Sequence, residues 1–158
     1  MKFTDILLPT DLSEASLPAT VCALDMAHQF GSTLHLLYVM EEPVVYVPLG
    51  GYYPNRDEWE SYAESGLENW ISQEDAEGLN IVRQKVFGHP ASAIVQYAKE
   101  HDIDLIVLGT HGRSAIPALV MGSVAENVVR LAPCPVMTVR PDQHDTSAPE
   151  VETACETL

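Results

Sequence analysis

Positive charge is scarce in this chain, whose 158 residues include eight Lys and Arg against 23 Asp and Glu, for a net charge of -15. Proteins that bind nucleic acid bring clustered Lys and Arg to the phosphate backbone, so the composition argues against a nucleic-acid partner. A polyanionic ligand would have to be held by local backbone amides, a helix end or a divalent cation, because the overall field repels it.

Cysteine and long apolar runs are also scarce. The three cysteines, Cys22, Cys134 and Cys155, form an odd set without C-x-x-C spacing, and no export signal stands at the N-terminus. We therefore expect a cytoplasmic protein without disulfides. The six histidines show neither HExxH nor paired ligand spacing, so we expect no protein-built metal site. The apolar runs are too short to cross a bilayer, so we expect no membrane insertion.

The hydrophobic pattern predicts strands and helices in alternation. Near-continuous apolar runs favour buried parallel strands, and amphipathic segments favour helices. The predicted strands are Lys2–Pro9, Thr33–Met40, Asn80–Phe87, Ile103–Leu108 and Val136–Val139. The predicted helices are Ser16–Phe30, Trp59–Ile71, Pro90–His101 and Ser123–Leu131. This order predicts an α/β fold with an open five-stranded parallel sheet and helices on both faces.

Two segments fall outside this alternation. Residues 41–56 contain Pro, Gly and Tyr too often for a regular element, and they read either as a plain loop or as a lid or partner surface. From residue 141 onward the chain contains Pro, Thr, Ser and acidic residues without Lys or Arg, which is typical of disorder. We therefore expect one folded domain over residues 1–140 and an acidic disordered tail over residues 141–158.

The most informative motif follows the fourth predicted strand. Gly109, Gly112, Gly122 and Ser123 form a G-x2-G-x9-G-S pattern between an apolar strand and a helix. Glycine permits left-handed turns and close backbone approach, which lets several N–H groups converge on one anion. Ser123 begins the helix, whose free N–H groups and dipole favour negative charge. We interpret the segment as a phosphate-binding loop; the alternative is that the glycines only shape a surface loop.

Ligands of open parallel sheets bind beyond the carboxyl ends of the strands, where the winding direction switches. The segments that meet there are Pro9–Asp11, Val39–Met40 and the glycine loop. Arg113 adjoins the loop, where its guanidinium could pair with a phosphate, or it is a solvated loop residue. Asp11 could simply cap the first helix in a capping-box-like arrangement with Glu14, a role that can coexist with a ligand contact.

Other well-known sites are absent from the sequence. It contains no G-x-G-x-x-G after the first strand, no G-x-x-x-x-G-K-[ST] and no G-x-S-x-G. The sequence therefore lacks the loops that are typical of common dinucleotide-binding proteins, P-loop NTPases and hydrolases with a nucleophile elbow.

With these motifs laid out, the chain resembles the universal stress protein family, and within it the ATP-binding branch. The resemblance rests on ILLPTDLSEAS, LHLLYV, VFGHP, LIVLGTHGR, GSVAENVVR and APCPVMTVR, and it covers about residues 1–140. It implies the Rossmann-like fold of the adenine nucleotide α-hydrolases, with residues 1–140 as the nucleotide-binding domain. It also implies a homodimer through the fifth strand, Val136–Val139, a short apolar edge that would benefit from cover.

The resemblance also implies a ligand and its contacts. ATP would bind with Mg2+ or Mn2+ on its phosphates, and the protein would act as a nucleotide-responsive stress or signalling module. The adenosine end would contact Asp11 and Val39, with Pro9 and Thr10 shaping the floor. The ribose and phosphates would be held by Gly109, Gly112, Gly122, Ser123 and Val124.

Two other functions stay open. A slow ATPase or self-phosphorylating enzyme would use Ser123 or a nearby hydroxyl with a metal ion, but no residue is an evident general base. We therefore predict no catalytic residue and at most weak hydrolysis. A nucleotide-independent interaction protein would instead use residues 41–56 and the acidic face of the second helix.

Overall fold

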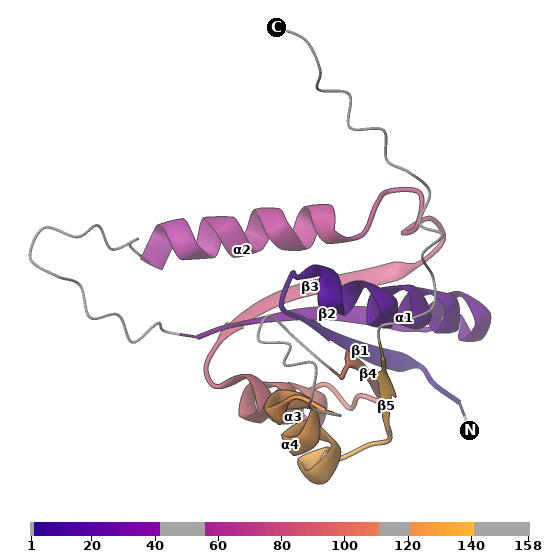
Figure 1. Cartoon of the computed structure of the whole chain (residues 1–158). Coiled ribbons are helices and arrows are strands. Elements are labelled where there is room, and N and C mark those ends of the chain that lie inside the picture. The colour runs from indigo at the N-terminus through magenta and orange to yellow at the C-terminus, as the bar shows by residue number, and fades with distance from the viewer. Residues whose placement is uncertain (1, 42–55, 111–120, 141–158) are drawn as a thin grey trace, which may run out of the picture.

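The structure is a computed structural model, and it describes residues 2–41, 56–110 and 121–140. Strands and helices alternate along these residues (Figure 1). The strands are β1 (Asp5–Thr10), β2 (Thr33–Met40), β3 (Asn80–Phe87), β4 (Leu105–Gly109) and β5 (Val136–Val139). The helices are η1 (Glu14–Ser16, 3-10), α1 (Leu17–Phe30), α2 (Arg56–Trp70), α3 (Pro90–Glu100) and α4 (Ser123–Leu131).

The strands form one parallel sheet in the order β3-β2-β1-β4-β5. Helices α1 and α2 cover one face, and α3 and α4 cover the other (Figure 1). The predicted α/β fold is therefore confirmed. The chain winds outward from β1 to β3 and then returns to the other side of β1, which places the switch in winding between β1 and β4.

The core lies in two layers because successive strand side chains point to opposite faces. In β1, Ile6 and Leu8 pack into the layer under α1 and α2, whereas Leu7 packs into the layer under α3 and α4. All three side chains are fully buried. Burial on both faces explains why the central strands read as continuous apolar runs and not as alternating ones.

The first strand is shifted relative to its prediction. It was expected over Lys2–Pro9, but β1 begins at Asp5 and continues through Pro9 to Thr10. Pro9 lacks an N–H and was expected to end the strand, yet it stays in register with Leu37 of β2. The proline is tolerated because pairing between β1 and β4 covers Ile6 and Leu7 and has ended before Pro9.

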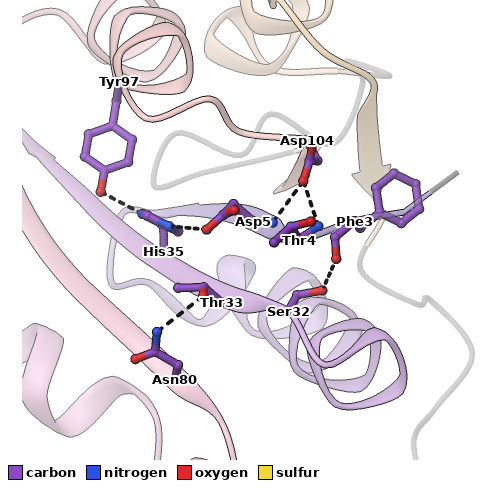
Figure 2. A network of polar contacts seen from close by, with 9 residues as sticks. All are labelled: Phe3, Thr4, Asp5, Ser32, Thr33, His35, Asn80, Tyr97 and Asp104. Carbon is purple, nitrogen blue, oxygen red and sulfur yellow. Dashed lines mark hydrogen bonds and ion pairs between the residues drawn. The ribbon is translucent and has the colours of Figure 1, made fainter.

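Polar side chains tie the elements together at the amino ends of the strands (Figure 2). His35 of β2 lies between Tyr97 Oη of α3, 2.9 Å from its Nδ1, and Asp5 Oδ1 of β1, 3.2 Å from its Nε2. Asp104 Oδ2, just before β4, accepts hydrogen bonds from the backbone N–H groups of Thr4 (2.7 Å) and Asp5 (3.1 Å). We call Asp5, His35, Tyr97 and Asp104 the amino-end network.

Candidate functional site

A cavity of about 450 Å³ lies at the opposite, carboxyl ends of the strands. Its walls come from the ends of β1, β2 and β4, the first turns of α3 and α4, and α2. The predicted site residues that line it are Pro9, Thr10, Asp11, Val39, Gly109, Gly122 and Val124. Ser123 is the first residue of α4, next to two of them. Gly112 and Arg113 lie outside the described residues, as do residues 42–55 and the tail from residue 141.

The cavity opens where two neighbouring strands separate. Pairing between β1 and β4 reaches only Leu7 and Ile106, although the strands run on to Thr10 and Gly109. The last residues of both strands are therefore free of each other and can face a ligand. This is the position at which doubly wound sheets bind their ligands, since the connections that follow β1 and β4 lead to opposite edges of the sheet.

The loop after β1 is held in one conformation by side-chain hydrogen bonds to its backbone. Thr10 Oγ1 accepts from the N–H of Leu12 at 3.0 Å. Asp11 Oδ1 accepts from the N–H of Ser13 at 3.0 Å and from the hydroxyls of Ser13 and Ser16, both at 2.6 Å. Leu12 has φ 59, a left-handed conformation that a leucine adopts only when its surroundings impose it.

These bonds correct the predicted capping role of Asp11. The residue before η1 is Ser13 and the residue before α1 is Ser16, and neither makes a side-chain capping bond. Asp11 stands further back and organises the turn itself, so it does not form a capping box with Glu14. The reason is that a short 3-10 turn is inserted ahead of α1, which moves the helix start away from Asp11.

The start of α4 offers a place for an anion. Gly122 precedes the helix with φ -73 and ψ 156, and the helix N-terminus has no side-chain capping bond within the described residues. The N–H of Gly122 donates to Thr110 O at 2.7 Å, and the N–H of Thr110 donates to Val139 O at 2.9 Å. Thr110 is thus fixed on β5, and Gly122 is fixed on Thr110. The first N–H groups of an α-helix have no partner within the helix itself, so the start of α4 is suited to an anion.

Gly122 does not need to be glycine for its own backbone, because φ -73 is open to any residue. That a glycine there allows a ligand to approach the helix end closely stays a prediction. Ser123, directly after it, adds a hydroxyl at the same helix start.

Negative charge is the electrostatic problem of this cavity. Asp11 and Glu41 line it, and no Lys or Arg does so within residues 2–41, 56–110 and 121–140. A bound phosphate would therefore need the amides and dipole of α4 and a counter-cation. Among the described residues, no cluster of three or more His, Cys, Asp or Glu side chains could hold such a cation without the ligand.

Sequence reasoning missed one wall of the site. The helical spacing of the apolar residues from Trp59 to Ile71 predicts that Trp59 faces the core, but Trp59 lines the cavity from α2, as Ile94 does from α3. Helical periodicity marks a side chain as inward-facing without saying whether it meets packed core or a cavity. Gly66 of α2 lies close to the loop after β1. A Cβ built on Gly66 would lie 2.5 Å from Leu12 Cδ1, so glycine leaves room for this leucine.

The described cysteines lie away from the cavity. Burial, and after it the charge of Asp25, raises the pKa of the Cys22 thiol above its ordinary value. Burial followed by the charge of Asp104 raises the pKa of Cys134. Both thiols are held in the protonated, weakly nucleophilic form, in which a cysteine packs as a small apolar residue.

Residues 2–140 match the family model described as the universal stress protein family. The chain belongs to the universal stress protein family. A universal stress protein of Methanocaldococcus jannaschii is 32% identical over 146 residues, which cover 87% of this chain and 82% of that protein. The solved structure of the universal stress protein UspA from Lactobacillus plantarum is 29% identical, with a TM-score of 0.74, and covers 89% of this chain and 99% of its own.

Another solved universal stress protein is a complex with cAMP. It is 25% identical to this chain with a TM-score of 0.65, and the match covers 90% of this chain and 100% of that one. That family member therefore binds a nucleotide. In the part of this universal stress protein that the structure describes, no helix combines the length and apolar character needed to span a bilayer.

Proposed function

We propose that this universal stress protein belongs to the ATP-binding branch and acts as a cytoplasmic, nucleotide-responsive stress or signalling module. The observation that carries the proposal is the cavity at the separation of β1 and β4, which ends at the N-terminus of α4, where the described residues supply no side-chain cap. Its volume of about 450 Å³ is within the usual range for small-molecule sites.

The cavity has a side suited to each part of ATP. Apolar groups from β2 and α3, including Val39 and Ile94, suit the adenine ring. Pro9, Thr10 and Asp11 of β1 and its loop would contact the adenosine. At the β4 side, the ribose and phosphates would meet the glycine loop, namely Gly109, Gly112, Arg113, Gly122, Ser123 and Val124.

A divalent cation, Mg2+ or Mn2+, would bind with the phosphates and not before them. Asp11 already accepts three hydrogen bonds within its own loop, and the cavity shows no ready cluster of ligands among the described residues. Phosphate oxygens must therefore supply most of the coordination. The cation would offset the negative charge that Asp11 and Glu41 bring to the cavity.

Binding is favoured over catalysis as the main activity. Asp11 is engaged by Ser13 and Ser16, so it is poorly placed to orient a water molecule for attack on a phosphate. We assign no catalytic residue. Slow ATP hydrolysis or self-phosphorylation is the second candidate function, and phosphate release above background would support it if it is lost in Gly122→Val.

We also propose a homodimer through β5. This strand is at the edge of the sheet, and Met137 on it and Val129 and Leu131 on the neighbouring α4 are exposed. A second copy would cover the open backbone groups of the edge. Light scattering should report twice the monomer mass, and Thr138→Pro should shift it to a monomer because proline removes an edge donor.

The test of ATP binding is isothermal titration of the full chain with ATP and Mg2+, followed by native mass spectrometry over hours. Gly112→Val and Gly122→Val should each weaken binding by about 100-fold, the loss of about two charge-assisted hydrogen bonds, with the fold retained. Asn80→Ala, at the other end of the sheet, is the matched control and should bind like the parent. No ATP binding by the parent would overturn the proposal.

A further inference from the structure

Leu12, in the loop after β1, has a backbone conformation that does not suit leucine. Its φ is 59°, and among the described residues other than glycine only Asp102 also has a positive φ. Asp tolerates such angles, whereas leucine is strained by them. Gly31 takes a similar φ of 64°, and a Cβ built on it would meet nothing within 4 Å. A leucine kept at such a φ therefore indicates that the side chain of Leu12 has a use of its own.

Gly66 is the opposite case, a glycine inside a helix. It lies within α2, where glycine is the poorest residue after proline and leucine is among the best. A Cβ at this position would lie 2.5 Å from Leu12 Cδ1 and 3.7 Å from Leu12 Cγ. Leucine thus stands where the backbone favours glycine, and glycine stands where the helix favours leucine. Both local disadvantages meet at one contact, which we call the Leu12–Gly66 contact; such paired departures from local preference are expected at functional sites.

The Leu12–Gly66 contact holds a loop that forms one wall of the cavity. Thr10 and Asp11, directly before Leu12, both line the cavity. The N–H of Leu12 donates to Thr10 Oγ1 at 3.0 Å, and the N–H of Ser13 donates to Asp11 Oδ1 at 3.0 Å. These bonds lie within the loop, whereas the side chain of Leu12 reaches across to α2 and packs against the core layer under α1 and α2. The loop is therefore fixed against a second element of the fold.

We propose that Leu12 is a positioning residue, whose side chain, seated against Gly66, holds the loop after β1 in the conformation that binds the adenosine end of a nucleotide. This inference rests on the proposed function and adds to it the contact that prepares the site before the ligand arrives. A loop that spends only a fraction of its time in the binding conformation reduces the affinity by that fraction. Contact with α2 offsets the strain at Leu12 and orders the loop in advance.

The experiment measures the affinity for ATP with Mg2+ in full-chain variants that circular dichroism shows to be folded. Leu12→Gly removes the side chain but suits a left-handed φ, so it should bind ATP about fivefold more weakly although its backbone is less strained. Leu12→Met restores an apolar side chain of similar volume and should bind within about twofold of the parent. Ile71→Val is the control, because Ile71 belongs to the same core layer and does not line the cavity. It should melt lower and bind ATP like the parent.

A double-mutant cycle tests the Leu12–Gly66 contact itself. In the parent, Gly66→Ala should lower the ATP affinity about twofold because the new Cβ displaces Leu12. In Leu12→Gly the same substitution should leave the affinity unchanged, since no side chain is left to displace. It should also raise the melting temperature of Leu12→Gly, because the helix preference of alanine is then unopposed. Equal effects of Gly66→Ala in the two backgrounds would overturn the proposal.

Hydrogen exchange without ATP tests the loop independently of any ligand. The N–H groups of Leu12 and Ser13 are held by Thr10 and Asp11, so they should exchange faster in Leu12→Gly than in the parent or Leu12→Met. Unchanged exchange in the loop, or parent-like ATP affinity in Leu12→Gly, would overturn the assignment of Leu12. In both cases ATP binding by the parent would leave the proposed function standing. Failure of the parent to bind ATP would overturn the proposed function and with it this role of Leu12.

Discussion

The amino and carboxyl ends of the same parallel strands are built differently. At the amino ends, Asp104 accepts two backbone N–H groups, and His35 joins Asp5 to Tyr97 (Figure 2). At the carboxyl ends, β1 and β4 separate around a cavity, and the N–H of Trp59 has no partner among the described residues. Hydrogen bonds join neighbouring elements at the amino ends, whereas β1 and β4 separate around the cavity at the carboxyl ends.

This difference teaches how one sheet can serve stability and binding without conflict. β1 starts in the amino-end network at Asp5 and ends at the cavity with Thr10, and β2 likewise carries His35 and Val39. Each strand is fixed at one end, so its other end can hold a separated, partly unsatisfied arrangement. We therefore expect mutations at the amino ends to change stability, and those at the carboxyl ends to change ligand affinity.

The largest effect is expected for His35→Leu. The substitution leaves the buried Tyr97 hydroxyl without its partner and removes the contact of Asp5, which should lower the free energy of unfolding by about 2–3 kcal/mol. Urea denaturation would measure the loss. Asn80→Ala, which removes a longer, exposed contact at the same ends of the strands, should cost much less. A parallel drop in ATP affinity would show that the two ends are not independent.

Asp11→Ala tests the other end. The carboxylate orders the loop after β1 through Ser13 and Ser16, so its loss should weaken ATP binding about tenfold while unfolding changes by about 1 kcal/mol. Calorimetric titration and urea denaturation give the two numbers. Asp11→Asn, which keeps an acceptor oxygen, should lie between the parent and the alanine variant. If Asp11→Ala lost stability but bound ATP like the parent, the carboxyl end of β1 would serve stability and not binding.

The loss of stability at alkaline pH should depend on Tyr97. Burial raises the pKa of this phenol, so the folded state holds the proton more tightly than the unfolded state. The resulting stability is complete below the ordinary tyrosine pKa of about 10 and is lost as pH rises through the folded pKa. Tyr97→Phe should reduce the loss of stability at alkaline pH. At neutral pH it should lower the free energy of unfolding by about 1 kcal/mol.

Unfolding free energies measured from pH 8 to 11 would check the prediction for Tyr97. Tyr62→Phe is the matched control, because Tyr62 is 60% exposed. This variant should lose stability at alkaline pH as the parent does. If Tyr97→Phe lost as much unfolding free energy at alkaline pH as the parent does, other groups would be responsible for that loss.

The smallest effect is expected for Gly66→Ala. Alanine favours the helix by about 1 kcal/mol, but its Cβ would displace the Leu12 side chain, whose Cδ1 is 2.5 Å from the ideal Cβ position. The two contributions oppose each other, so unfolding should change by less than about 1 kcal/mol. Because Leu12 lies beside Asp11, ATP affinity should fall about twofold. Glu68→Ala, exposed on the same helix, should leave affinity unchanged.

Most elements could be predicted because their signals are local. The ranges Thr33–Met40, Asn80–Phe87 and Val136–Val139 were predicted as strands and are strands, since apolar, β-branched runs bounded by turns indicate buried strands. The prediction of the helix Ser123–Leu131 was also correct, with glycine before it and inward-facing residues at helical spacing. The first strand was misplaced at both ends because its limits depend on Asp104, about 100 residues away, and on where pairing with β4 stops.

The candidate site was predicted in part for a similar reason. Strand ends that follow apolar runs are visible in the sequence, and parallel strands place their carboxyl ends together, so Thr10, Val39 and Gly109 were expected to meet and do line one cavity. Their contacts with a nucleotide stay a prediction. Trp59 was not found because its signal is identical to that of a packed core residue.

By itself, the sequence determined the alternation of strands and helices, the shortage of positive charge and the glycine pattern, because each depends on residues that are near neighbours in the chain. Tertiary structure alone decided the rest. It joined His35 to Tyr97 across 62 positions, separated β1 from β4, and left Trp59 unsatisfied at the cavity. Such contacts arise from strand order and helix packing, which bring together residues that no local pattern connects.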